Sequence, residues 1–288
     1  MPGARCGIIG GTGIDEIEGL TNREEIEVAT PFGAPSSHVI VGKLMGVNVA
    51  FLPRHGEGHL LLPSEINFRA NIFALKKLGV ELILSVSAVG SLKEDIIQLN
   101  IVLPDQFFDR TKNRVSTFFG NGIVVHVNFA DPICPSLRNI VYNVCRELEI
   151  EVVNGGTYIC IEGPHFSSRA ESKFYRKFGF DIIGMTNLPE AKLAREAEIC
   201  YCTIALVTDY DCWHEDYTEV DIDMVFENLK RNSENAKIII KNSILKIPEQ
   251  RDCTCRKALE NAIITRDDLI TDSVKKKLQP IIGNYLKP

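Results

Sequence analysis

Two aspartates that flank a tyrosine, Asp209 and Asp211, are the residues of this chain whose types and spacing best suit catalysis. They follow a continuous apolar run at residues 203–207, which is typical of a strand buried on both faces, and open α/β proteins usually bind ligands at the carboxyl ends of such strands. Residues two apart on an extended chain point the same way, so both carboxylates are expected to face one site. One protonated and one ionised carboxyl there can bind and protonate a nitrogen heterocycle. The alternative is that they only cap a turn or the next helix.

Two turns near the N-terminus carry donors that suit an anion. Residues 6–13 read as a short buried strand that opens into a glycine-rich turn, where Thr12 adds a hydroxyl. The spacing does not match the GxGxxG fingerprint of dinucleotide sites, and a tight turn without a ligand is the alternative. In the loop at residues 53–59, Arg54 offers planar donors suited to phosphate and His55 offers a further donor, although a solvated basic loop has the same composition.

Two more apolar runs end in polar side chains. The run at residues 82–91 ends in small residues, where Ser87 and the backbone N–H groups that follow it can donate to an oxyanion. The run at residues 181–186 ends in the thioether of Met185 and the hydroxyl of Thr186. These strand ends extend the set of groups that could cradle phosphate.

Two ring-bearing residues have weaker signals. Phe166 follows a predicted strand at residues 156–164 and has the flat face needed to stack on a base, although an isolated aromatic residue is more often part of a core. His126 lies among alternating apolar residues and is interpreted as a structural or interface histidine. Phosphate donors together with groups that read a base predict a nucleoside enzyme.

Strand-like and helix-like segments alternate along most of the chain. Apolar residues at helical spacing predict helices at residues 65–78, 137–148, 188–197, 223–245 and 271–285. This alternation predicts an α/β fold with a largely parallel sheet. Because no linker, repeat or low-complexity segment divides the chain, residues 1–288 are expected to form a single domain, with residues 246–288 as a helical tail.

The totals exclude several classes of function. The chain has 288 residues, a formal net charge of −6 and no long basic run, which argues against a general nucleic-acid surface. No apolar run approaches the roughly 18 residues of a membrane span. The N-terminus leads into a strand without the pattern of a signal peptide, so a soluble, cytoplasmic protein is expected.

Nine cysteines are spread along the chain, a usage more typical of buried reduced thiols than of a disulfide framework. No CxxC pair appears, and no helix or acid completes a site with His55 and His59, so neither a zinc site nor another metal or cofactor is expected. Cys253 and Cys255 are a close pair, interpreted as two thiols in a polar loop.

Six motifs along the chain stand in the order of one known family. They are Gly7-Ile8-Ile9-Gly10-Gly11-Thr12-Gly13, Pro53-Arg54-His55-Gly56, Ser87-Ala88-Val89-Gly90-Ser91-Leu92, Glu162-Gly163-Pro164, Met185-Thr186 with Pro189-Glu190, and Thr208-Asp209-Tyr210-Asp211-Cys212-Trp213. The chain resembles the 5′-methylthioadenosine phosphorylases of the trimeric purine nucleoside phosphorylase family, from about residue 6 to residue 241. The resemblance implies a central mixed, largely parallel twisted sheet flanked by helices.

The resemblance also implies an activity. Members of this group cleave 5′-methylthioadenosine with inorganic phosphate to adenine and 5-methylthioribose 1-phosphate, in methionine and polyamine salvage. Phosphate is a co-substrate, and no cofactor is implied. A homotrimer or a dimer of trimers with active sites at subunit interfaces is implied as well. The alternative activity is that of a purine nucleoside phosphorylase acting on inosine, guanosine or a broad set of 6-aminopurine nucleosides.

The resemblance assigns roles residue by residue. Asp209 would be the acid at purine N7, and Asp211 would help to receive the 6-amino group. The positions implied to hold phosphate are Thr12, Arg54, His55, Ser87, Ala88 and Thr186. The positions implied to contact the nucleoside are Phe166, Ile183, Met185, Ile222, Val225 and Phe226, the last three forming a methylthio pocket, together with His126 donated by a neighbouring subunit.

Three positions depart from the family or vary within it. His165 stands where relatives commonly carry arginine after Glu162-Gly163-Pro164, so any charge balance at that position is not carried over. Cys134 and Cys200 correspond to cysteines that are paired in some thermophilic relatives, and a disulfide between them is therefore a hypothesis for this chain.

Overall fold

The fold is built around a mixed sheet whose most buried strand carries the two aspartates at its end. A computed structural model describes residues 3–11, 14, 18–214 and 222–286, apart from the side chains at 222 and 224. The strands are β1 (Cys6–Gly10), β2 (Leu20–Ile26), β3 (Val39–Leu44), β4 (Val47–Pro53), β5 (Leu82–Ser91), β6 (Ile101–Leu103), β7 (Gln106–Arg110), β8 (Val152–Asn154), β9 (Thr157–Ile161), β10 (Ile182–Gly184) and β11 (Cys200–Asp209).

The sheet branches at β5. One path runs β2-β3-β4-β1-β5-β10-β9-β7, and β11 pairs with β5 on its other side and continues to β6 and β8. Most pairings are parallel, while β2–β3, β3–β4, β5–β10 and β6–β11 are antiparallel. The prediction of a mixed, largely parallel sheet in a single α/β domain is therefore confirmed.

Strand β5 has a gap in its hydrogen-bonded pairing along one edge. On one edge, β5 pairs with β1 over residues 82–85 and with β10 at residues 90–91. Residues 86–89 lie between these two partners and have no ladder partner on that edge among the described strands. Along the other edge, β11 follows β5 from Cys200↔Leu82 to Asp209↔Gly90, with an irregularity between Val207 and Asp209. The gap leaves backbone groups of β5 available to line a cavity.

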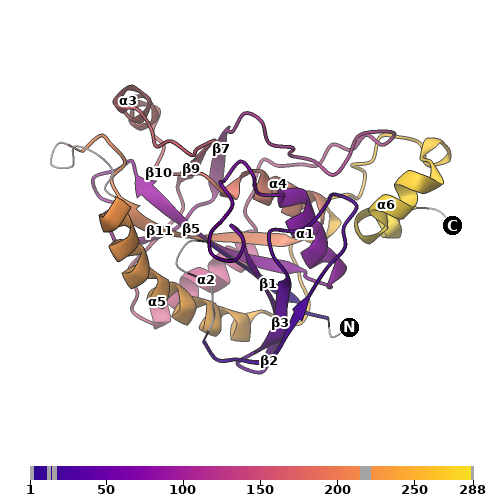
Figure 1. The fold of residues 1–288 in the computed structure, drawn as a ribbon, viewed down its shortest axis with the longest axis horizontal. Helices are drawn as coiled ribbons and strands as arrows, with labels where there is room; N and C mark the ends of the chain where they lie inside the picture. Colours follow the sequence, from indigo (N-terminus) through magenta and orange to yellow (C-terminus); the bar gives the residue numbers. More distant parts are fainter. Residues whose placement is uncertain (1–2, 12–13, 15–17, 215–221, 287–288) are drawn as a thin grey trace.

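Helices cover both faces of the sheet (Figure 1). Their bounds are α1 (Phe68–Lys77), α2 (Pro135–Glu147), α3 (Arg169–Lys177), α4 (Asn187–Glu196), α5 (Ile222–Lys246) and α6 (Asp272–Ile282). In Figure 1, α1 and α4 lie above the sheet and α2 and α5 below it. Because both faces are covered, every residue of β11 is buried, which explains why its sequence is apolar throughout rather than alternating.

The sequence predicted five of the helices to within a few residues and missed other elements. The edge strand β2 reads Leu-Thr-Asn-Arg-Glu-Glu-Ile and is mostly exposed, so it lacks an apolar pattern. Helix α3 begins with a capping box in which Ser168 and Glu171 bond reciprocally, a sequence signal that was overlooked. The segment around His126 forms no strand, only an isolated bridge between Val125 and Ile263.

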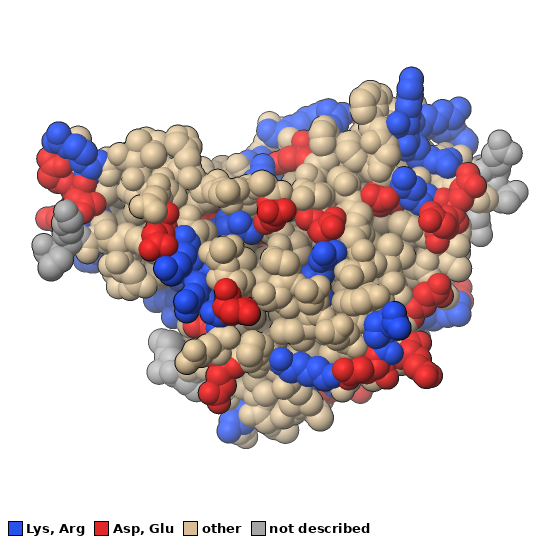
Figure 2. Space-filling model, turned by 180° about the vertical axis from the view of Figure 1, so that it is seen from behind, with Lys and Arg blue, Asp and Glu red and all other residues tan. Residues whose placement is uncertain are grey.

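Figure 2 shows one face of the surface, where acidic and basic side chains stand in small groups separated by uncharged areas. Basic side chains gather at the upper right of this view, over the end of the molecule that carries α3. None of the described helices combines the length and apolar character that crossing a bilayer requires.

Candidate active site

A cavity of about 370 Å³ opens over the gap in β5, within the size range of small-molecule sites. Its wall includes most of the residues expected to bind a substrate, drawn from six elements and loops. The expected residues on the wall are Arg54, His55, Ser87, Ala88, Phe166, Ile183, Met185, Thr186, Asp209, Asp211, Val225 and Phe226. Thr12 and the side chain of Ile222 lie outside the described residues.

The two aspartates share the cavity, but not for the reason that the sequence indicated. Strand β11 ends at Asp209, and Asp211 lies in the left-handed region with φ of 53°. The Asp211 backbone N–H donates to Asp209 Oδ1 at 2.8 Å, so the chain turns around the Asp209 carboxylate. A side-chain-stabilised turn, rather than an extended chain with period two, brings both carboxylates to one wall.

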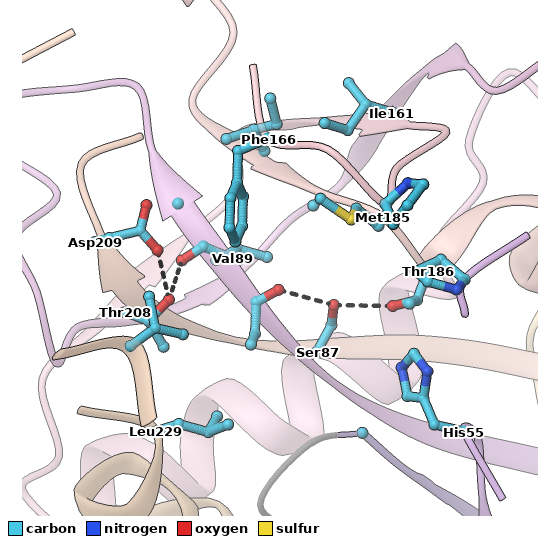
Figure 3. A pocket seen from close by; sticks show the side chains of 18 of the residues that line it. His55, Ser87, Val89, Ile161, Phe166, Met185, Thr186, Thr208, Asp209 and Leu229 are labelled. Atoms are coloured by element: carbon cyan, nitrogen blue, oxygen red, sulfur yellow. Dashed lines mark hydrogen bonds between the residues drawn. The ribbon is translucent and has the colours of Figure 1, made fainter. Parts of the chain in front are cut away.

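The Thr208 hydroxyl is a hydrogen-bond partner of Asp209. The Thr208 hydroxyl lies 2.7 Å from Asp209 Oδ2 and 3.2 Å from the Val89 carbonyl oxygen, as Figure 3 shows. A hydroxyl has one proton, so both contacts are satisfied together only when Oδ2 carries a proton that it donates to Thr208. When Asp209 is ionised, the Thr208 hydroxyl donates to the carboxylate instead. Thr208 can therefore partner either protonation state.

Burial adjusts the acidity of both carboxyls. It raises the pKa of Asp209 above its ordinary value, an effect only partly offset by the hydrogen bond from Thr208. Burial also raises the pKa of Asp211 to about 6, and the neighbouring Asp209 charge adds to the rise. The Ser172 and Ser167 hydroxyls oppose this rise, and the Asp211 carboxyl lines the cavity as a hydrogen-bond acceptor.

Arg54 is a buried partner of Glu190. Its Nε donates to Glu190 Oε2 at 2.8 Å and its Nη2 to Glu190 Oε1 at 3.0 Å, and both side chains are fully buried. Nη1 donates to the Val86 carbonyl at 2.8 Å and Nη2 also donates to Ser85 Oγ at 2.6 Å. These bonds occupy four of the five guanidinium N–H groups. The planar fork expected to face phosphate therefore faces Glu190, and one Nη1 proton has no acceptor among the described residues.

His55 is held as a neutral ring with one tautomer. Its Nδ1 lies 2.9 Å from the Leu61 carbonyl oxygen, which can only accept, so Nδ1 carries the proton and Nε2 is the other, unprotonated nitrogen. Burial lowers the pKa of His55 to about 4. His59 stacks on the ring with centroids 4.1 Å apart. His55 was expected to donate to phosphate, yet in this state Nε2 accepts, for example from a protonated phosphate oxygen.

Hydroxyl groups gather beside these basic residues. Ser87 Oγ lies 3.2 Å from Thr186 Oγ1 and 3.2 Å from Tyr158 Oη. Thr186 precedes α4, but its hydroxyl does not cap that helix, so it is available to the cavity. Figure 3 shows Ser87, Thr186 and His55 at one end of the cavity and Asp209 at the other.

Apolar side chains fill the space between the two ends. Phe166 and Met185 point into this middle part of the cavity in Figure 3. Phe166 is 49% exposed, which leaves its ring face free to meet a flat ligand. Val225 and Phe226 come from the first turns of α5 and line the cavity beyond Asp211. The cavity is thus polar at two ends and apolar between them.

His126 does not reach this cavity within one chain. It lines a separate hollow with Asp105, Arg138 and Arg195. Two important side chains had been missed or misread from the sequence. Tyr158 was part of a predicted strand and received no role, and Glu190 was named only as part of a motif. Neither residue has a local signal, because each acts through a partner far away in the chain.

The α/β sheet carries one cavity with basic and hydroxyl side chains at one end and two carboxyl groups at the other, and this arrangement defines the class of protein. The chain belongs to the phosphorylase superfamily, whose profile matches residues 5–245. It is 54% identical over 282 residues to S-methyl-5′-thioadenosine phosphorylase of Koribacter versatilis, covering 98% of this chain and 97% of that protein. It is 55% identical over 281 residues to the protein of the same name in Geobacter sulfurreducens, covering 97% and 98%.

A solved structure shows the same fold. A methylthioadenosine phosphorylase sourced from an antarctic soil metagenomic library superposes with a TM-score of 0.93 at 48% sequence identity, covering 98% of this chain and 99% of that one. At this identity and coverage, the similarity extends over the whole described sheet and the helices around it.

Proposed function

We propose that the protein cleaves 5′-methylthioadenosine with inorganic phosphate, releasing adenine and 5-methylthioribose 1-phosphate. The observation that carries this proposal is the placement of Asp209 and the Ser87–Thr186 hydroxyl pair at opposite ends of one cavity, with Phe166 between them. A nucleoside bound along that cavity has its base at the carboxylate end and its anomeric carbon toward the anion end. The names of the similar proteins support the same reaction.

The chemistry needs no side-chain nucleophile. Phosphate itself attacks the anomeric carbon, so the protein has to orient it and to place charge. Ser87, Thr186, His55 and the remaining Nη1 proton of Arg54 are the groups that hold phosphate in this proposal. As the glycosidic bond breaks, the ribose gains positive charge and the departing purine gains negative charge. The reaction requires no cofactor in this proposal.

Asp209 donates the proton that the departing base requires. Its raised pKa increases the protonated fraction, and the proton moves from Asp209 to N7 as negative charge grows on the purine. The Thr208 hydroxyl then donates to the Asp209 carboxylate that forms, which stabilises it. Because the Thr208 hydroxyl already lies beside the Asp209 carboxylate when it forms, the proton transfer needs little reorganisation of the surrounding groups.

Asp211 favours a 6-aminopurine over a 6-oxopurine. Its carboxylate lines the cavity as an acceptor, and an exocyclic amino group is a donor that can bind to it. A 6-oxo group presents another acceptor, which cannot donate to the Asp211 carboxylate. The apolar wall at Val225 and Phe226 suits a methylthio group better than a 5′-hydroxyl, by about 1–3 kcal/mol.

The deciding experiment measures adenine release from 5′-methylthioadenosine with and without phosphate. We expect release only with phosphate, together with stoichiometric 5-methylthioribose 1-phosphate and much slower cleavage of inosine. Phosphate-independent release indicates a nucleosidase, faster cleavage of inosine indicates the purine nucleoside phosphorylase alternative, and tight binding of adenine without turnover indicates a binding protein. Each of these results contradicts the proposal in a different way.

We also propose that the active protein is a homotrimer or a dimer of trimers and acts in the cytoplasm. His126 would then reach the cavity of a neighbouring subunit, consistent with its position away from the cavity of its own chain. Large exposed aromatic residues support such a subunit contact, namely Phe108, Phe174 and Phe178. Mass photometry and comparison of wild-type protein with His126→Ala, assayed for KM of methylthioadenosine, test this arrangement.

A further inference from the structure

Four cysteines from three parts of the chain bring their sulfur atoms together. Cys134 precedes α2, Cys200 begins β11, and Cys253 and Cys255 flank Thr254 in the segment after α5. All four sulfur atoms lie within 4.8 Å of one another, and the Sγ atoms of Cys200 and Cys253 are 3.2 Å apart. Three of the side chains are buried and that of Cys253 is half-buried. We call these four residues the thiol cluster.

The size of the thiol cluster matches a tetrahedral metal site. A zinc ion at about 2.3 Å from each of four thiolates places the sulfur atoms about 3.8 Å apart. In the thiol cluster the Cys200 and Cys253 sulfur atoms are 3.2 Å apart and no two sulfur atoms are more than 4.8 Å apart, so small shifts reach that value. We propose that Cys134, Cys200, Cys253 and Cys255 bind one structural zinc ion.

The scaffold around the thiol cluster fixes its members independently of one another. The Cys134 backbone N–H donates to the Tyr201 carbonyl at 3.0 Å, which ties the start of α2 to β11. Cys255 lies in a short 3-10 helix, Thr254–Lys257, whose end is closed by the bond from Ala258 N–H to the Cys255 carbonyl. In Figure 1, α2, β11 and α5 are neighbours, so the thiol cluster joins the segment after α5 to both other elements.

Charge around the thiol cluster suits a zinc–thiolate centre. Four thiolates and one Zn²⁺ carry a net charge of −2, which needs a nearby cation when it is buried. Arg251 Nη1 donates to Cys200 Sγ at 3.8 Å, and the same atom is held by the carbonyl oxygens of Glu81 and Glu198. Binding the ion replaces each remaining S–H bond with a Zn–S bond and releases the proton to solvent.

The thiol cluster lies far from the reaction. Cys200 and Asp209 are the first and last residues of β11, which puts them about 30 Å apart along the strand. The ion therefore has a structural role and no part in catalysis. The absence of a CxxC pair predicted no zinc site, and a disulfide between Cys134 and Cys200 was a hypothesis. Both interpretations overlooked that four sulfurs, rather than two, meet at this point.

The test begins with the metal content of the wild-type protein, purified under a reductant that does not bind metal and then dialysed. Elemental analysis is expected to find about one zinc per chain. Replacing zinc with cobalt(II) should give the visible absorption of a tetrahedral thiolate site. Cys200→Ser and Cys255→Ser should lose most of the zinc, whereas Cys145→Ser and Cys202→Ser, which alter buried thiols outside the cluster, should retain it.

A stability measurement keeps the test decisive where a serine variant does not fold. Removing zinc from the wild-type protein with a chelator should lower Tm by about 5 °C or more, and added zinc should restore it. Wild-type protein that is folded, free of zinc and unaffected by added zinc overturns the proposal. The mass of zinc-free protein purified without reductant gives a second check. A mass lower by two hydrogens for each bridge shows that these cysteines form disulfides, and this result also overturns the proposal.

Discussion

Arg54 and Glu190 form a doubly hydrogen-bonded ion pair with no exposure to solvent, 136 residues apart in the chain. Ser85 and Tyr201 also donate to Glu190 Oε1, each at 2.7 Å. The pair therefore belongs to a closed network that fastens the end of β4 to α4, directly behind the phosphate end of the cavity. Burial opposes the charge on Arg54, but Glu190 more than compensates and raises the pKa of the guanidinium.

Glu190→Gln is expected to reduce the free energy of unfolding by about 3–5 kcal/mol, because it leaves the buried charge of Arg54 without its partner. Urea unfolding of the variant measures the loss. The matched control is Glu94→Gln, which breaks the exposed pair with Arg176 at 3.1 Å and should cost no more than about 1 kcal/mol. If both substitutions lower the free energy of unfolding equally, the buried pair contributes no more to stability than the exposed pair.

Asp209→Asn is expected to lower kcat by about 10²–10⁴-fold, because the amide cannot give a proton to the departing base. The fold should remain intact, since the amide oxygen can still accept from the Asp211 backbone N–H. Steady-state kinetics with methylthioadenosine and a thermal melt provide the measurement. Asp95→Asn, at an exposed position, is the control and should leave kcat unchanged. A folded Asp209→Asn protein with wild-type kcat contradicts the role given to this residue.

Asp211→Asn is expected to stabilise the fold at neutral pH while weakening selection for the 6-amino group. The pKa of Asp211 rises from 3.8 in the unfolded chain to about 6 in the folded protein, so the native state holds its proton more tightly. The resulting stabilisation is complete below pH 3.8 and is lost as pH rises through 6. Relative to an uncharged side chain, Asp211 then costs the native state about 3 kcal/mol at most.

The free energy of unfolding of wild type and of Asp211→Asn is measured from about pH 5 to about pH 8, a range that includes the shifted pKa. The two curves should converge toward the acid end and separate toward the alkaline end, with the variant the more stable. A difference between the proteins that does not vary with pH would mean that Asp211 is not protonated in the folded state.

Gly90→Ala is expected to lower kcat by about tenfold or more, because the new methyl group displaces the acid. A Cβ atom at position 90 would lie 2.8 Å from Asp209 Oδ1 and 3.1 Å from Ile183 Cγ2. Gly3→Ala is the matched control, since its methyl group meets only the Leu78 carbonyl oxygen at 3.9 Å. Unchanged kinetics in Gly90→Ala would show that the position of Asp209 tolerates movement.

Local patterns predicted the secondary structure and the neighbourhood of the site well. The apolar runs that became β5 and β11 have no other stable place than the middle of a covered sheet, and their polar ends then meet at one edge. Strand β2 was missed because its side chains are mostly exposed and carry no apolar alternation. What a residue touches depends on packing between distant segments, and this is where prediction failed. The fork of Arg54 was expected to face phosphate and faces Glu190 instead.

The same limit applies to the aspartates and the cysteines. Both aspartates were placed at one site, but on the assumption of an extended chain, whereas the turn at Asp211 depends on a hydrogen bond to Asp209. The four cysteines have no shared spacing in the sequence. Only the packing of α2 and the segment after α5 against β11 brings their sulfur atoms together.

The gap in the pairing of β5 separates the strands that support the phosphate end of the cavity from those that support the base end. Strand β1 supports the phosphate end before residues 86–89, while the end of β11 supports the base end beyond them. Substitutions in the turn after β11 can therefore alter which purine is accepted without disturbing the strands that position phosphate. During divergence, a protein with this sheet can change its choice of base while its reaction stays the same.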